Sequence, residues 1–160
     1  MMGAAQFEAH DPQFEARVRA SFARQGAMAL IGADLVGVAP GAVDIALPFR
    51  RDLTQQHGYL HAAVVTAILD SACGYAALSL LPAGTEVLTI EYKVNFVAPA
   101  RGRRVIARGR VMKLGRTITV CAGDAVAEPE PEPEQGGPQR LVATMLATMI
   151  AAPLRTDGEA

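Results

Sequence analysis

Residues 62–81 read AAVVTAILDSACGYAALSLL, an apolar run with the length of a membrane-spanning helix. The run is rich in alanine, and Asp70 stands near its middle, where a carboxylate costs roughly 2.5–3.5 kcal/mol on membrane-insertion scales. Segments of alternating polarity follow, as is typical of a water-soluble domain. We therefore predict a buried helix over residues 61–80, ended by Pro82 and Gly84, in preference to a membrane span.

The chain as a whole has the composition of a globular protein. Its 160 residues are 51% hydrophobic and 19% charged, which excludes global disorder and favours one domain, or at most two small ones. The formal net charge is −1, so no overall charge indicates a nucleic acid or an anionic membrane as partner. The first residues lack a basic segment followed by a long apolar one, and a cytoplasmic location is expected.

Strand-like periodicity begins after the long helix. A first strand is expected over residues 88–96, and three further strands are expected over residues 103–114, 116–127 and 139–151. Residues 128–138 include alternating Glu and Pro, and we expect an extended, mobile hairpin loop there, with an acidic tether as the alternative. The first strand is predicted from five apolar residues that alternate with polar ones: Leu88, Ile90, Tyr92, Val94 and Phe96.

A short helix and a hairpin are predicted upstream of the long helix. Residues 11–25 have the spacing of an amphipathic helix, which Gly26 is expected to end. Residues 28–38 and 42–49 are apolar and flank a turn-forming Ala-Pro-Gly, which indicates two paired strands. A polar connector then leads into the long helix.

These elements predict an α+β architecture in which an antiparallel sheet curls around one long helix, the hotdog arrangement. A helix of 20 residues is about 30 Å long, and one that is apolar on all sides must be covered by other elements. The sheet edges and one side of the helix stay uncovered. We therefore expect self-association, as a homodimer or as a dimer of dimers, a homotetramer.

Asp70 is the anomaly of the long helix, because an ionised carboxylate is costly to bury unless it is paired, hydrogen-bonded or open to water. The neighbouring positions on its helix face hold small residues, which leave space for a substrate or for a closely packed helix. The alternative is a buried carboxylate bonded to nearby backbone. The small residues of this face are Ala63, Thr66, Ala67, Cys73, Gly74 and Ala77.

Polar side chains crowd the connector into the helix: Gln55, Gln56, His57 and His61. A helix start offers unpaired backbone N–H groups and the positive end of the helix dipole, which suit an oxyanion or a polarised carbonyl. The amides of Ala62 and Ala63 are the expected donors. A histidine at this position is also a common helix cap, so these polar residues indicate a functional site only in combination with Asp70.

Residues 57–75, HGYLHAAVVTAILDSACGY, resemble the HGG-to-Asp signature of the PaaI-type hotdog thioesterases, which hydrolyse acyl-CoA or aryl-CoA thioesters. The spacing from His61 to Asp70 agrees with that signature. The resemblance covers about residues 28–151 and continues through three shorter matches, at residues 88–100, 107–111 and 115–119. It implies an N-terminal helix and tail, a thioesterase domain and a C-terminal tail, over residues 1–27, 28–152 and 153–160 respectively.

The resemblance also implies roles for individual residues. Asp70 would activate water or attack the thioester itself, and Thr89 matches a Ser or Thr that assists the water. Gln55 stands where the family usually has Asn, and Ala62 stands where a glycine N–H polarises the thioester carbonyl. In this family the site lies across a dimer interface, so Asp70 would act opposite Gln55 and Ala62 of a second subunit.

Two departures from the family pattern concern the carbonyl-binding end. Ala62-Ala63 replaces Gly-Gly, which keeps the amide donor but narrows the approach to the backbone. Gln55 is longer than Asn by one methylene, and His57 could substitute as a donor. We expect His57, Ala63, Cys73 and Gly74 to contact the substrate.

The segment from Tyr92 to Gly123 has no acidic residue, and it carries eight basic ones: Lys93, Arg101, Arg103, Arg104, Arg108, Arg110, Lys113 and Arg116. Guanidinium groups suit phosphate oxygens, so Arg104, Arg108 and Arg116 are expected to hold the phosphates of coenzyme A. The alternative is a solvated sheet face that the acidic loop balances. Interleaved exposed aromatics are missing, so nucleic acid is not an expected partner.

The sequence thus predicts an acyl-CoA thioesterase that needs no metal and no separate cofactor, because coenzyme A is part of the substrate. Two alternatives stay open: a hydratase or dehydratase that uses Asp70 with His61, and a non-catalytic acyl-CoA binding module. Cys73 and Cys121 have no CxxC or nearby histidine, so neither a zinc site nor a disulfide is expected.

Overall fold

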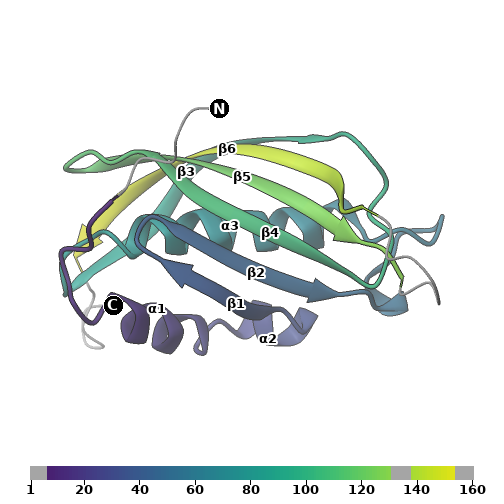
Figure 1. Ribbon diagram of the computed structural model, residues 1–160, viewed down its shortest axis with the longest axis horizontal. Coiled ribbons are helices and arrows are strands. Elements are labelled where there is room, and N and C mark those ends of the chain that lie inside the picture. Colours follow the sequence, from purple (N-terminus) through teal and green to yellow (C-terminus); the bar gives the residue numbers. More distant parts are fainter. Residues whose placement is uncertain (1–6, 131–137, 154–160) are drawn as a thin grey trace, which may run out of the picture.

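The computed structural model describes residues 7–130 and 138–153. One sheet of six antiparallel strands, in the order β1-β2-β4-β5-β6-β3, curves around helix α3 (Ala62–Leu78), with helices α1 and α2 beside it (Figure 1). This arrangement confirms the predicted α+β hotdog fold. The strands are β1 (Asp34–Ala39), β2 (Ala42–Pro48), β3 (Thr85–Phe96), β4 (Arg104–Lys113), β5 (Ile118–Glu128) and β6 (Arg140–Pro153).

Helix α3 fills the concave side of the sheet. Its branched side chains Val65, Ile68 and Leu69 are fully buried, and the helix packs against β2, β4 and β5. A Cβ atom at Gly109 of β4 would lie 2.4 Å from the carbonyl oxygen of Ala72, so only glycine lets this strand approach the helix so closely. Within the described ranges, no helix combines the length and the apolar character that crossing a membrane requires.

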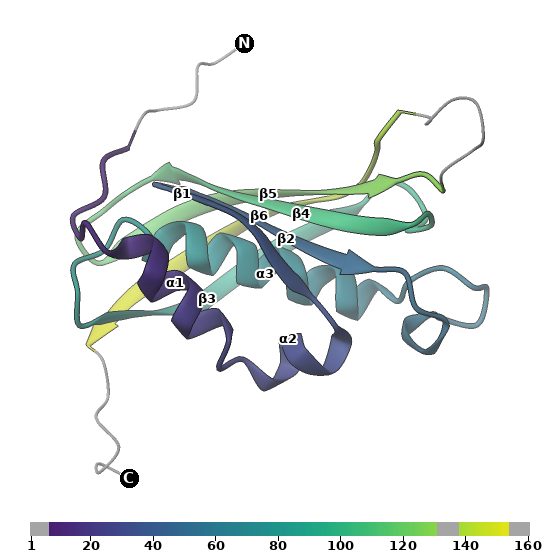
Figure 2. The same cartoon turned by 60° about the horizontal axis from the view of Figure 1, so that its bottom comes forward.

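The N-terminal helix α1 (Phe14–Phe22) is hydrogen-bonded to the C-terminal end of α3. The Arg17 guanidinium donates to the carbonyl oxygens of Leu78 and Leu81, at 3.2 and 2.6 Å, and its Nε atom lies 3.1 Å from an Asp11 carboxylate oxygen. Because the last carbonyls of a helix have no partner within it, a cation in this place satisfies them and complements the helix dipole. Figure 2 shows α1 lying alongside α3.

The structure corrects the prediction for residues 26–33. Gly26 begins a second helix, α2 (Gly26–Ile31), and the strand predicted from residue 28 starts only at Asp34. Gly32 has a φ of +72°, and the Ala33 N–H bonds to the Met28 carbonyl at 2.9 Å, which is a helix-ending Schellman turn. A short apolar run has no periodicity that distinguishes a helix from a strand. In this segment the more informative signal was Gly32, the residue that ends α2.

Strand β3 forms one edge of the sheet and pairs with β6 alone among the described strands. The register between β3 and β6 shifts between Thr89 and Glu91, which marks a bulge at Ile90. Leu88 and Ile90 are 61% and 52% exposed on this strand. The predicted mobile loop lies mostly in residues 131–137, which are outside the described residues, as are residues 154–160.

Candidate active site

Asp70 and Thr89 meet where α3 faces β3. The Thr89 hydroxyl donates to Asp70 Oδ1 at 2.7 Å, and the same hydroxyl lies 3.4 Å from the Met149 sulfur. The Asp70 side chain is half-buried. Its recorded hydrogen bond is to a side chain on β3, which disfavours the alternative of a carboxylate locked to nearby backbone.

Two cavities open beside Asp70. One, of about 470 Å³, lies between α1, α3 and β3 and includes Gly74, Tyr75 and Thr89 in its lining. The other, of about 530 Å³, extends toward the start of α3 along Ala63 and Thr66. Volumes of this size are typical of small-molecule sites. Asp70 therefore stands at the junction of two spaces that can hold a substrate.

Of the small-residue face of α3, Ala63, Thr66, Ala67 and Gly74 line these cavities. Cys73 is a correction: it is fully buried, its Sγ atom points toward Gly123 of β5, and burial raises the pKa of its thiol. A position three residues from Asp70 is rotated away from the carboxylate, far enough in this helix to face the sheet. Ala77 is also fully buried.

Part of the first cavity comes from an N-terminal segment whose sequence carries no signal of a site. Ser21 lies on α1 and Gln25 precedes α2, and both line the cavity opposite α3. The Ser21 hydroxyl lies 3.4 Å from the Tyr75 hydroxyl, and the Ser71 hydroxyl donates to Gln25 at 3.3 Å. No local sequence pattern indicates that a surface helix covers a cavity, so the place of Ser21 and Gln25 in the cavity wall follows only from the folded structure.

At the other end of α3, His61 acts as the helix cap. Its Nδ1 atom accepts the Ala63 N–H at 3.0 Å, which occupies one of the two amides expected to bind the carbonyl. Within the described residues the Ala62 N–H has no recorded protein acceptor. Gln55 accepts a hydrogen bond from the His57 backbone N–H. Gln55, His61 and Ala62 line a third cavity, of about 630 Å³.

One chain does not bring Asp70 together with Gln55 and Ala62. Ala62 comes eight residues before Asp70 on the same helix, which corresponds to about 12 Å along the axis. The two groups of residues are therefore spatially separate within a single chain.

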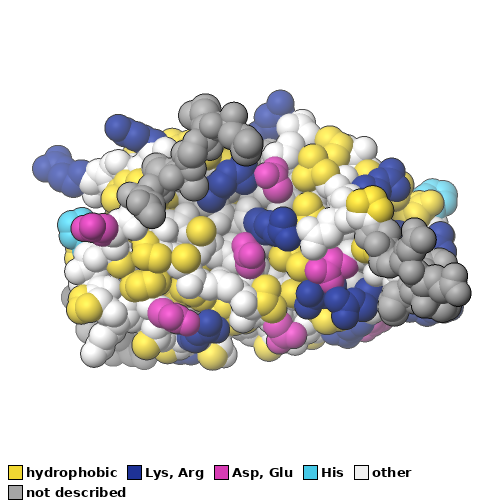
Figure 3. Space-filling view, in the orientation of Figure 1, with side chains coloured by type: hydrophobic (Ala, Val, Ile, Leu, Met, Phe, Trp, Pro, Cys, Tyr) yellow, Lys and Arg dark blue, Asp and Glu magenta, His cyan; other side chains and the backbone are white. Residues whose placement is uncertain are grey.

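The basic face of β4 is largely neutralised by acidic residues of β5. Arg104 donates to both carboxylate oxygens of Glu128, at 2.6 and 3.1 Å, and Arg110 pairs with Asp124 at 2.9 Å. Figure 3 shows cationic and anionic side chains interspersed over this face. The Arg104 and Arg103 guanidinium groups lower the pKa of Glu128 to about 2.

This pairing corrects the phosphate-binding assignment of Arg104, whose guanidinium is already engaged. Arg108 donates to Gln139 at 2.9 Å and lies near Asp44, whose pKa is raised by burial and lowered in part by Arg108. Arg116 is exposed between β4 and β5. The strand register explains why β5 carboxylates neutralise the arginines of β4, because it places Arg104 opposite Glu128 and Arg108 opposite Asp124.

Comparisons with known proteins identify relatives of the whole fold. The model of the thioesterase superfamily matches residues 57–134. The crystal structure of a thioesterase family protein from Silicibacter pomeroyi is 48% identical, with a TM-score of 0.82 over 88% of this chain and 98% of that one. The PaaI protein of the phenylacetic acid degradation operon of E. coli is 16% identical, with a TM-score of 0.76 over 90% of this chain and 97% of that one, a likeness of fold alone.

A protein assigned as an esterase in Halobacterium salinarum is 29% identical over 101 residues, or 60% of this chain. The chain spans 66% of the length of that curated relative.

Proposed function

Because this chain belongs to the thioesterase superfamily of hotdog proteins, we propose that it hydrolyses acyl-CoA or aryl-CoA thioesters, with Asp70 as the residue that activates water. The observation that carries the proposal is the position of Asp70, half-buried at the junction of two cavities and bonded to Thr89. A carboxylate so placed can reach a bound molecule without being sealed in the core.

In the proposed reaction, Asp70 takes a proton from water while the water oxygen attacks the thioester carbonyl carbon. The tetrahedral oxyanion collapses, the C–S bond breaks, and the proton passes from Asp70 to the departing thiolate. Thr89 holds one carboxylate oxygen, which leaves the other for the water. A direct attack by Asp70 on the thioester would form an anhydride that water then hydrolyses. Transfer of ¹⁸O from solvent into the Asp70 carboxylate in a single turnover would identify this anhydride mechanism.

We propose that the carbonyl oxygen binds at the start of α3 in a second copy of the chain, beside Ala62 and Gln55. The Ala62 N–H and the positive end of the helix dipole would stabilise the oxyanion. The exposed β3 edge supports this arrangement, because β3 has no strand partner on its outer side among the described residues, and an edge with exposed apolar side chains is suited to pairing with another copy. Two such sites would then form in each dimer.

The decisive experiment compares Asp70→Asn with Asp34→Asn, an exposed aspartate of β1 that serves as the matched control. Turnover is measured by thiol release over short, medium, long and aromatic CoA thioesters. Asp70→Asn should keep the fold and lower kcat about 100-fold to 10,000-fold, the usual contribution of a general base, whereas Asp34→Asn should match the wild type. An unchanged rate for Asp70→Asn on the best substrate would overturn the proposal.

Product analysis separates hydrolysis from the hydratase alternative. The Nδ1 atom of His61 accepts the Ala63 N–H as the cap of α3, so the neutral imidazole carries its proton on Nε2, which disfavours this histidine as a general base. We expect free thiol and free acid in equal amounts, with no enoyl thioester. Saturable binding of acyl-CoA without turnover at any chain length would instead identify a binding module.

A further inference from the structure

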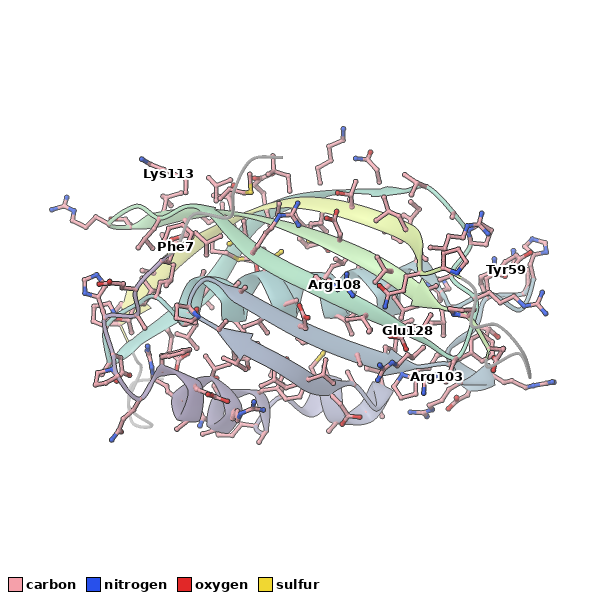
Figure 4. The ribbon with its side chains drawn as sticks, in the orientation of Figure 1. Phe7, Tyr59, Arg103, Arg108, Lys113 and Glu128 are labelled. Carbon is pink, nitrogen blue, oxygen red and sulfur yellow. The ribbon has the colours of Figure 1, made fainter. Side chains whose placement is uncertain are left out.

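A separate pocket with basic side chains lies at the end of the molecule where α3 begins. It has a volume of about 470 Å³ and lies between the connector before α3 and the loop that joins β3 to β4. Figure 4 shows Tyr59 at this end, the same end as Arg103 and Glu128. The lining residues are Phe49, Arg51, Thr54, His57, Gly58, Tyr59, Arg101, Gly102 and Glu130.

The two arginines of this pocket differ from their neighbours in sequence. Within residues 7–130 and 138–153, neither Arg51 nor Arg101 forms an ion pair, whereas Arg50 binds Asp52 at 2.5 Å and Arg103 binds Glu128 at 2.7 Å. Both Arg51 and Arg101 are exposed. The fold thus neutralises the adjacent basic residues and leaves this pair available for an anion.

The two loops that carry these arginines are held together by backbone bonds. Thr54 and Leu60 form an isolated bridge, and the Leu60 N–H donates to the Ala100 carbonyl at 3.0 Å. Gly102 has a φ of +135°, and a Cβ atom there would lie 2.1 Å from the Glu128 carbonyl oxygen. The position of Arg101 is therefore set by a turn that requires glycine.

The pocket adjoins the proposed carbonyl-binding end of α3. Tyr59 lines both this pocket and the third cavity, which also contains Gln55 and Ala62. A thioester with its carbonyl at Ala62 can therefore extend its thiol portion past Tyr59 toward Arg51 and Arg101. Two aromatic side chains, Phe49 and Tyr59, also border the pocket and could contact a base.

We propose that the Arg51-His57-Arg101 pocket binds the phosphorylated nucleotide end of the coenzyme A thioester. This inference rests on the proposed function and assigns the phosphates to a different place from Arg104 and Arg108. Guanidinium groups bind phosphate through paired N–H donors, and the imidazole adds a further donor. Glu130 lies in the same wall and opposes an anion, so removing its charge should strengthen binding.

The test measures binding of adenosine 3′,5′-bisphosphate by calorimetry, together with steady-state kinetics. The double variant Arg51→Gln/Arg101→Gln should bind the bisphosphate at least tenfold more weakly than the wild type, and Glu130→Gln should bind it more tightly. The matched control is Lys113→Gln, an exposed cation at the end of β4 that does not line this pocket and lies at the opposite end of the molecule from Tyr59 (Figure 4). An unchanged affinity in the double variant, or an equal loss in Lys113→Gln, overturns the assignment.

Kinetics with two thioesters of the same acyl group provide the second measurement. For the CoA ester, the double variant should raise KM about tenfold with kcat retained. For the N-acetylcysteamine ester, which lacks the nucleotide, it should leave both constants unchanged and so also report an intact fold. Equal losses on the two esters would contradict the proposal. Bisphosphate binding that depends on Arg51 and Arg101 without hydrolysis of any thioester would sustain the pocket and reject the hydrolase.

Discussion

The Thr89 hydroxyl donates a 2.7 Å hydrogen bond to the Asp70 carboxylate, and this bond connects the edge strand β3 to the central helix α3. Asp70 lies on a helix and Thr89 beside a β-bulge. The register of β3 therefore governs the orientation of the proposed catalytic carboxylate.

Loss of this hydroxyl should slow the reaction while preserving the fold. We expect Thr89→Ala to lower kcat about tenfold, the effect of about 1.4 kcal/mol on the barrier, which is less than the loss for Asp70→Asn. Thr89→Ser keeps the hydroxyl and should retain most of the activity. Steady-state kinetics of the two variants check this, and equal activity of Thr89→Ala and wild type would remove Thr89 from the site.

Gly74 should determine the size of the acyl group. A Cβ atom there would meet nothing within 4 Å, and a glycine inside a helix costs roughly 0.5–1 kcal/mol relative to alanine. Gly74→Ala should therefore raise the melting temperature. Gly74→Leu should fill the cavity next to Asp70, lowering kcat/KM for aromatic and long acyl thioesters much more than for an acetyl thioester.

Gly26→Leu is the control for this series, because Gly26 has equally open surroundings and does not line the cavity. It should leave the substrate preference unchanged. The same change of preference in both leucine variants would show that Gly74 has no special role.

The Glu128 ion pairs should make stability depend on pH in the acid range. The pKa of this carboxyl falls from its ordinary value of 4.5 to about 2 in the folded protein. The stabilisation is therefore complete above pH 4.5 and is lost as the pH falls toward 2. Glu128→Gln should melt at a lower temperature than wild type at pH 7, and this difference should disappear by pH 2.

Calorimetric melting curves at pH 7, 4.5, 3 and 2 provide the measurement. Asp34→Asn serves as the control, because this carboxyl is exposed and forms no ion pair within the described parts of the chain. A constant difference between Glu128→Gln and wild type across this range would exclude a contribution from the ion pairs.

Disruption of the β3 edge should separate assembly from folding. Ile90 is 52% exposed on this edge, and a lysine there places a charge where a second strand would pair. We expect Ile90→Lys to be a folded monomer with most of its thioesterase activity lost. Leu30→Lys changes a residue of α2 that is 78% exposed and should keep both the assembly state and the activity. Sedimentation velocity and kinetics are the measurements, and an active Ile90→Lys monomer would refute the shared site.

Local patterns were sufficient for the main elements of the fold. The apolar run around Asp70 predicted α3, and the alternation from Leu88 to Phe96 predicted most of β3. The apolar run is a strong signal because most of α3 is buried under the sheet. The alternation located β3 but did not identify a core face, because Leu88, Ile90, Tyr92 and Phe96 are 44–61% exposed. The segment that forms α2 is too short for such a signal, and its prediction as a strand was wrong.

The candidate site was predicted in part, because its geometry depends on contacts between distant segments. Asp70 and Thr89 were predicted and do meet. The engagement of Arg104 by Glu128 and the availability of Arg51 follow from strand register and loop packing, which no local spacing encodes. The burial of Cys73 depends on which side of α3 the sheet covers.

The attachment of Arg17 to the carbonyls ending α3 makes the N-terminal helices part of the architecture around the proposed reaction centre. Val18, one residue further along α1, is fully buried in the core. A shortened protein starting after these helices would leave those carbonyls without their cation and remove one wall of the cavity beside Gly74. Truncation of these helices would therefore alter the shape of the cavity beside Gly74 as well as the stability of the folded chain.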